Sequence, residues 1–196
     1  MTRRRDFLAA SLLPAALAAA GFTLPSAGQS FGRLRKPLFT RDPFTLGVAA
    51  GYPTVDGMVL WTRLAPDPLA DDPSADPDDF EVRYEIAEDP GFARLVKSGR
   101  TRSEARHAHS VHLEVRGLPA GRDFYYRFRA GDYTSPVGRS WTAAARGQTI
   151  ERLRIGVASC QHFEQGYYHA YQHMVARGVD LVLHLGDYIY EGNTGK

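Results

Sequence analysis

The sequence has 196 residues, of which 43% are hydrophobic and 23% are charged, which is typical of a globular protein with one or two small domains. The formal net charge is +2, but the first 27 residues carry three arginines against one aspartate, which leaves 21 basic and 21 acidic residues in the remainder. This balance and the lack of a basic stripe exclude a dedicated nucleic-acid-binding surface, and a single cysteine excludes an internal disulfide.

The beginning of the chain has the pattern of an export signal. Residues 1–27 combine a basic start, an apolar stretch and a small-residue end, and Arg4 and Arg5 stand in a twin-arginine pattern. A membrane-anchoring helix is the alternative, but the apolar stretch is shorter than the roughly 20 residues that span a bilayer. We therefore predict export by the twin-arginine machinery to the periplasm or outside, with no stable membrane span in the mature form.

A polar, basic linker at residues 28–41 separates this signal from a β-rich region at 42–146. Apolar and polar side chains alternate there in four segments, which are bounded by turn-forming residues and lie at 57–66, 79–89, 109–118 and 122–131. In the second segment Phe80, Val82, Tyr84 and Ile86 share one face. We predict an all-β sandwich with its own core. The acidic stretch 69–79 lacks regular calcium-ligand spacing and is expected to be a solvated loop.

The stretch "LPAGRDFYYRF" resembles the fibronectin type III pattern of a leucine, a turn and then an aromatic residue that enters a strand. In that fold the aromatic residue is typically a tyrosine whose hydroxyl bonds back to the backbone. The matching residue here is Phe124, which has no hydroxyl. We therefore expect a fibronectin type III-like sandwich without that corner hydrogen bond.

The last segment, residues 151–196, has the pattern of a βαβ unit. An apolar strand is expected over 153–159, a helix over 166–178 because Tyr167 and Met174 recur at helical spacing, and a second apolar strand over 180–187. A strand that is apolar on both faces is typical of a parallel sheet covered on each side. The segment is predicted to begin an α/β domain.

Three side chains that can bind metals follow the two expected strands. Cys160 follows the first strand, Asp187 follows the second, and Tyr190 lies three residues further on. If the strands are neighbours, their carboxyl ends bring these residues together, and thiolate, carboxylate and phenolate together suit ferric iron. Each residue alone also fits a plain role: a buried small residue, a helix cap or a packing aromatic.

The histidines nearby are not expected to be ligands. His184 precedes the second strand's end and is interpreted as packing. His169 and His173 are four residues apart, a spacing that is compatible with metal binding, but exposed histidines on a helix usually bind no metal.

Three longer stretches resemble the PhoD-like alkaline phosphatases, and they occur in that family's order: "PFTLGVAAGYPTVDGMVLWTRL", "ASCQHFEQGYYHAYQHM" and "DLVLHLGDYIYEG". The resemblance implies an exported phosphomonoesterase or phosphodiesterase with a sandwich followed by an α/β metallophosphatase domain. It implies that Cys160 and Tyr190 bind Fe3+ and that Asp187 bridges it to Ca2+. It also implies that a metal-bound hydroxide attacks phosphorus in a phosphate mono- or diester.

Two features depart from that family pattern. Ala50 and Tyr52 stand where the first signature usually has serine and aspartate. The family's further ligands, which include an asparagine, histidines and aspartates, lie downstream of the tyrosine motif. The resemblance therefore implies an incomplete metallophosphatase domain at 151–196, and this chain alone is expected to be inactive.

Two alternatives remain open. A purple acid phosphatase-like enzyme also pairs a sandwich with a metal-binding tyrosine, but it offers an aspartate where "ASCQ" has Cys160. A non-catalytic sandwich module with a vestigial last segment is the second alternative.

Overall fold

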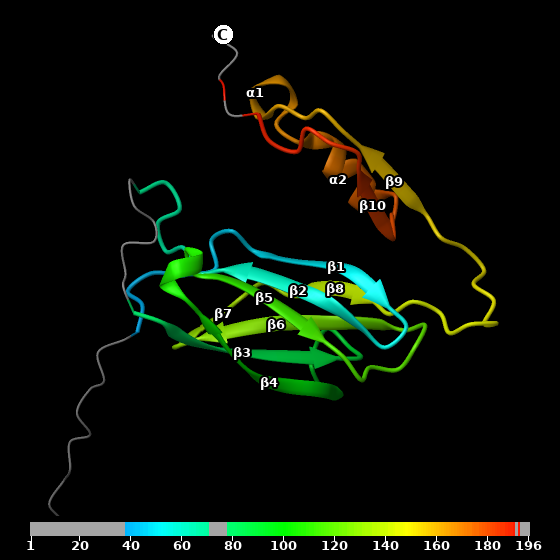
Figure 1. Ribbon diagram of the computed structural model, residues 1–196, viewed down its shortest axis with the longest axis horizontal. Coiled ribbons are helices and arrows are strands. Elements are labelled where there is room, and N and C mark those ends of the chain that lie inside the picture. Colours follow the sequence, from blue (N-terminus) through cyan, green and yellow to red (C-terminus); the bar gives the residue numbers. More distant parts are fainter. Residues whose placement is uncertain (1–37, 71–77, 191, 193–196) are drawn as a thin grey trace, which may run out of the picture. The chain divides into compact units, whose positions relative to one another are not determined.

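Figure 1 shows a computed structural model of the chain, which describes residues 38–70, 78–190 and 192. The predicted export signal, most of the predicted linker and residues 71–77 of the acidic loop lie outside the described residues. Residues 42–141 form two antiparallel sheets, so the predicted all-β sandwich is confirmed. No helix in the described part of the chain is long and apolar enough to cross a bilayer.

The first sheet has the strand order β1-β2-β5. Its strands are β1 (Val48–Thr54), β2 (Gly57–Arg63) and β5 (Ser110–Val115). Met58 pairs with Val115, which fixes the register of β2 against β5. The strand β1 is irregular between Gly51 and Thr54, where Tyr52 adopts a φ of +50°.

The second sheet has the order β4-β3-β6-β7, and β8 also pairs with β6. Its strands are β3 (Phe80–Ala87), β4 (Leu95–Ser103), β6 (Asp123–Ala130), β7 (Tyr133–Thr134) and β8 (Gly138–Trp141). A 3-10 helix, η1 (Ala105–His107), precedes β5.

The core lies between the inward faces of these sheets, because successive side chains of a strand point to opposite faces. The buried apolar residues include Leu60, Val82, Ile86, Val111, Val115, Phe124, Tyr126 and Phe128. The predicted inward face of β3 is therefore confirmed. The segment before β1 also contributes, since Phe39 is buried with its ring centroid 4.9 Å from that of Phe80.

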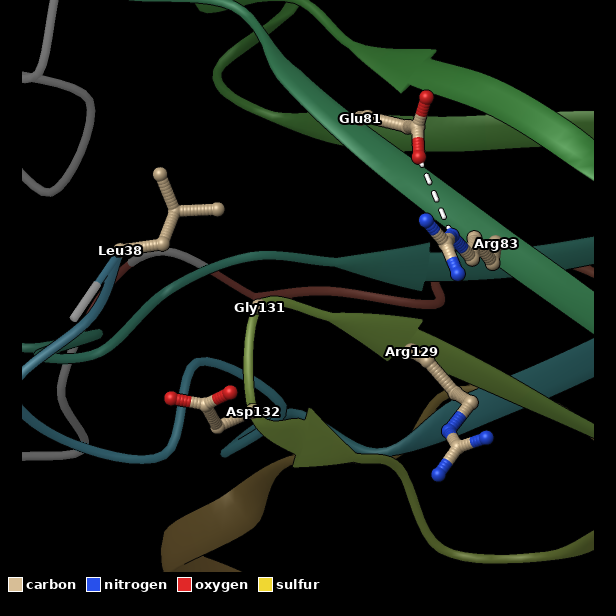
Figure 2. Close-up of a pocket in the computed structure, with 6 residues that line it drawn as sticks. All are labelled: Leu38, Glu81, Arg83, Arg129, Gly131 and Asp132. Atoms are coloured by element: carbon tan, nitrogen blue, oxygen red, sulfur yellow. Dashed lines mark hydrogen bonds and ion pairs between the residues drawn. The ribbon is translucent and has the colours of Figure 1, made fainter. Parts of the chain in front are cut away.

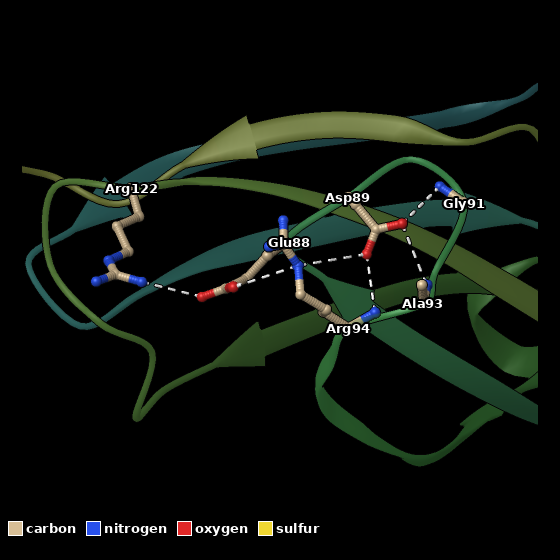
Figure 3. A network of polar contacts seen from close by, with 6 residues as sticks. All are labelled: Glu88, Asp89, Gly91, Ala93, Arg94 and Arg122. Carbon is tan, nitrogen blue, oxygen red and sulfur yellow. Dashed lines mark hydrogen bonds and ion pairs between the residues drawn. The ribbon is translucent and has the colours of Figure 1, made fainter.

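The turn that joins β3 to β4 is closed by one carboxylate. Asp89 accepts hydrogen bonds from three backbone N–H groups of the turn, at distances between 2.8 and 3.1 Å (Figure 3). These bonds, with that of Arg94 foremost, lower the pKa of Asp89. Glu88 lies 3.8 Å from Arg94 and accepts a hydrogen bond from Arg122 at 3.0 Å, which ties the turn to the chain just before β6.

Hydrogen bonds stabilise the corner before β6 without the tyrosine of the fibronectin type III pattern. Phe124 is fully buried and contributes only packing. Thr142, after β8, donates a hydrogen bond from its Oγ1 to the carbonyl of Pro119 at 2.6 Å and accepts one from the backbone N–H of Arg122 at 3.2 Å. The threonine hydroxyl therefore links the strand end to the corner where the fibronectin pattern has its tyrosine.

The last segment forms the predicted βαβ unit. Its elements are β9 (Ile155–Ala158), α1 (Phe163–Gly166), α2 (His169–Ala176) and β10 (Leu181–His184). The strands β9 and β10 are parallel and hydrogen-bonded neighbours, with Ile155 opposite Leu181. The single helix expected over 166–178 is wrong in detail, because Tyr167 and Tyr168 have φ values of +48° and +58° and separate α1 from α2.

Candidate metal centre

The carboxyl ends of β9 and β10 carry two of the predicted site residues into adjacent loops. The backbone N–H of Leu185 donates to the carbonyl of Ala158 at 2.8 Å, and that of Cys160 donates to the carbonyl of Gly186 at 3.1 Å. The strand pairing thus continues into the loops. Gly186 has a φ of +137°, which only glycine adopts readily, and it turns the chain directly before Asp187.

Three side chains converge at this edge of the sheet. One carboxylate oxygen of Asp187, Oδ2, accepts a hydrogen bond from the hydroxyl of Tyr190 at 2.9 Å and one from the thiol of Cys160 at 3.3 Å. All three residues are solvent-exposed, with Tyr190 44% exposed. The structure therefore brings together the three residues that the sequence singled out, in a place that a ligand can reach.

At this edge two residues have an unfavourable backbone conformation, and one tyrosine has a shifted pKa. Cys160 and Asp187 adopt left-handed φ values of +54° and +50°, which cost non-glycine residues of order 1 kcal/mol each and often occur at functional sites. Hydrogen bonds with Cys160 and Asp187 raise the pKa of Tyr190, because both neighbours favour the protonated phenol. A cation that replaced the protons of the thiol and the phenol would be bound by three anionic donors, so the chemistry of the donor set fits a metal.

Three histidines of the segment, His169, His173 and His184, stay outside this convergence. The Nδ1 atom of His184 accepts a hydrogen bond from the backbone N–H of Gly186 at 3.4 Å, and the ring packs edge-on against Tyr188 with centroids 4.8 Å apart. His169 and His173 are exposed on α2. Within the described ranges, no three His, Cys, Asp or Glu side chains form a group that could hold a metal, so the site depends on Tyr190 as its third donor.

Two hollows of the described residues are large enough for a small ligand. One of about 260 Å³ opens beside Cys160 and is lined by Gln161, Tyr168 and His169 among others. A larger one of about 540 Å³ lies on the sandwich (Figure 2), where Arg83 donates to Glu81 at 3.1 Å and stands opposite Arg129 on the neighbouring strand. The lining of the larger hollow offers paired surface charges and no nucleophile or soft metal donor, so we place the chemistry at the smaller one.

Comparison with known proteins identifies the family. A family model described as "PhoD-like phosphatase, N-terminal domain" matches residues 30–144, and one described as "PhoD-like phosphatase" matches residues 155–196. The chain belongs to the PhoD-like phosphatase family. The resemblance read from the sequence is thereby confirmed.

Two individual relatives, a curated protein and a solved structure, agree with this PhoD-like assignment. Alkaline phosphatase D of Bacillus subtilis (strain 168) is 44% identical over 171 residues, which are 87% of this chain and 29% of that protein. A solved structure described as "Structure of PhoD" has 47% identity and a TM-score of 0.75, and the match covers 80% of this chain and 30% of that one. A human fibronectin type III domain, from the KIAA0970 protein, matches with 16% identity and a TM-score of 0.38 over 54% of this chain and 77% of that one. The chain thus spans about 30% of the length of its PhoD-like relatives.

One departure from the PhoD-like pattern now has a physical description. Tyr52, at the position where the first signature usually has aspartate, is 75% exposed and adopts a left-handed φ of +50°. Aspartate tolerates this region better than a bulky aromatic residue does. Nothing in the structure explains the other departure, Ala50.

Proposed function

We propose that this chain supplies the sandwich and the first metal ligands of an exported, metal-dependent hydrolase of phosphate mono- or diesters. One observation carries the proposal. The thiol of Cys160 and the hydroxyl of Tyr190 both donate a hydrogen bond to the same carboxylate oxygen of Asp187, within the segment that matches the phosphatase family. Sheet edges of this kind are where open α/β proteins bind their ligands.

The donor set defines which group would be held. We assign Fe3+ to Cys160, Asp187 and Tyr190, because thiolate and phenolate are soft or strongly donating anionic ligands and the carboxylate completes an anionic set. The family resemblance implies Ca2+ as a second cation, which Asp187 would also help to hold, because calcium prefers oxygen ligands. When bound, two such cations polarise a phosphate ester and stabilise negative charge on its oxygens.

The protein's own residues then have distinct tasks. The backbone bond from Cys160 to Gly186 and the left-handed turn at Asp187 hold the thiol and the carboxylate on one side of the sheet edge. Tyr190 reaches back to the same carboxylate oxygen. The hollow beside Cys160 leaves room for the organic part of an ester. Within the described residues no three His, Cys, Asp or Glu side chains form a metal-binding group, so we propose that this part of the chain does not hold a complete two-metal site.

An assay tests the function directly. Chromogenic phosphate monoesters and diesters are offered, with iron and calcium, to the 196-residue chain and to an extended form that carries a whole PhoD-like domain. We expect turnover by the extended form and negligible turnover by the chain alone. Failure of the extended form with every ester contradicts the phosphatase proposal and favours a non-catalytic sandwich module. Comparable turnover by both forms contradicts the placement of the site.

Export is proposed from the leader at residues 1–27, in which Arg4 and Arg5 form the twin-arginine pair. Replacing both by lysine keeps the charge but removes the guanidinium pair, so we expect the precursor to stay unprocessed in the cytoplasm. Cell fractionation with an antibody measures this, and the Arg3→Lys variant serves as the matched control. Equal processing of the double variant and the control contradicts the twin-arginine route.

A further inference from the structure

His162 contacts the candidate metal centre through its ring, a feature that neither the sequence pattern nor the family match assigns. It lies in the loop after β9, two residues beyond Cys160. Its ring stacks on that of Tyr190 with centroids 5.8 Å apart and an interplanar angle of 28°. Its Nε2 atom lies 2.7 Å from the carbonyl oxygen of Gly192.

The hydrogen bonds of His162 fix its tautomer. The backbone N–H of Glu164 donates to Nδ1 at 3.3 Å, and a backbone N–H can only donate. The proton of the neutral ring therefore resides on Nε2, which donates to the carbonyl of Gly192. Both ring nitrogens thus have partners, and these partners hold the ring in one orientation.

This orientation connects the two loops of the site at a second point. Near the sheet, the backbone bond between Cys160 and Gly186 joins the loops. Further out, His162 joins them through Gly192 and through the face of Tyr190. The hydroxyl of Tyr190 reaches Asp187 between these two connections. A tyrosine held on one ring face and at its hydroxyl has little freedom to swing away.

We propose that His162 is a positioning residue, whose ring holds Tyr190 in the orientation that turns its hydroxyl toward Asp187 and Cys160. The part of this proposal that concerns iron rests on the proposed function. The part that concerns the orientation of Tyr190 does not, because it follows from contacts within the protein alone.

Two substitutions separate the roles of His162. His162→Asn keeps a side chain that can accept from the N–H of Glu164 and cap α1, but it removes the ring. His162→Phe keeps a ring that can stack on Tyr190 but removes both hydrogen bonds. His173→Asn, on the exposed side of α2, is the matched control for the same chemical change.

The first measurement needs no metal. Tetranitromethane nitrates exposed, mobile tyrosines, and mass spectrometry reports the rate at Tyr190 in the metal-free extended form. We expect nitration of Tyr190 to be several-fold faster in His162→Asn and close to wild type in His173→Asn. In His162→Phe we expect an intermediate rate, because the stacking ring is kept without the hydrogen bonds that orient it. A wild-type rate of nitration in His162→Asn overturns the proposal. A rate in His162→Phe as fast as that in His162→Asn also overturns it, because the ring contact would then not restrain Tyr190.

The second measurement uses Fe3+ added to the same proteins. We expect His162→Asn to bind iron about tenfold more weakly, as is typical when a residue that orients a ligand is lost. We also expect His162→Asn to shift the tyrosinate-to-iron absorption band, and His162→Phe to restore the affinity and the band in part. A wild-type protein without such a band overturns the iron assignment but leaves the nitration result standing, so the two failures are distinguishable. A normal band and affinity in His162→Asn overturns the role of His162 toward the metal.

Discussion

Replacing Asp187 by asparagine is expected to abolish most phosphatase activity of the extended form while leaving its fold intact. One oxygen of Asp187 receives both the Tyr190 hydroxyl and the Cys160 thiol, at 2.9 and 3.3 Å. The amide has the same shape, and asparagine tolerates the left-handed φ of +50° found there. It lacks the negative charge that the proposed site would use to hold two cations. Loss of a residue that only orients a ligand costs about 10- to 100-fold, so loss of the ligand itself should cost at least about 100-fold.

The control for this prediction is Asp132→Asn, which removes an exposed carboxylate from the turn between β6 and β7. We expect it to change activity by less than about twofold, since surface substitutions away from a site are close to neutral. Elemental analysis should find less iron in Asp187→Asn than in the control. If Asp187→Asn retains full activity and full metal content, Asp187 is no ligand and the site lies elsewhere.

The strands that the sequence predicted share one property, which is a clear alternation of large apolar residues. In β6, Phe124, Tyr126 and Phe128 all point inward and are buried. The strand β4 was missed because its inward positions hold Lys97, Gly99 and Thr101 in place of large apolar residues. The strand β4 lies at the edge of the sheet and pairs only with β3. Backbone hydrogen bonds to β3 therefore determine its position, and its own sequence of apolar and polar residues does not.

The strand β1 was missed for a related reason. Its sequence VAAGYPT has small residues, a proline and a left-handed tyrosine, all of which weaken a strand pattern. Pairing with β2 determines its structure, through contacts such as that between Val48 and Thr62. Tertiary pairing overrides weak local preference in both strands.

The site was predictable to the extent that topology determines it. Two neighbouring parallel strands must bring Cys160 and Asp187 to one edge, and the pairing of β9 with β10 does so. The part played by His162 was not predictable, because its partners arise only when the chain returns at Tyr190 and Gly192. The break between α1 and α2 was likewise not predictable, because the left-handed φ values of Tyr167 and Tyr168 do not show in the helical spacing of apolar residues.

The sandwich is expected to fold alone, as residues 38–146, and to depend strongly on Phe128. That range contains the whole core, from Phe39 to Ala130. Expressed alone, it should give a β-type circular dichroism spectrum and one cooperative melt. Phe128 is fully buried and contacts Tyr126 edge-on, with ring centroids 6.3 Å apart. Truncation of Phe128 to alanine removes this packing and leaves a cavity, which typically costs about 3–5 kcal/mol.

That loss is a large share of the free energy of unfolding, which is only about 5–15 kcal/mol for a domain. The matched control is Leu69→Ala, an apolar truncation at a side chain that is 93% exposed, which should change the free energy of unfolding by less than about 0.5 kcal/mol. Urea unfolding of the three proteins measures both values. If the isolated piece shows no cooperative transition, the sandwich is no independent unit and needs the βαβ segment. If Phe128→Ala is as stable as the control, the core is centred elsewhere than between the inward faces of the two sheets.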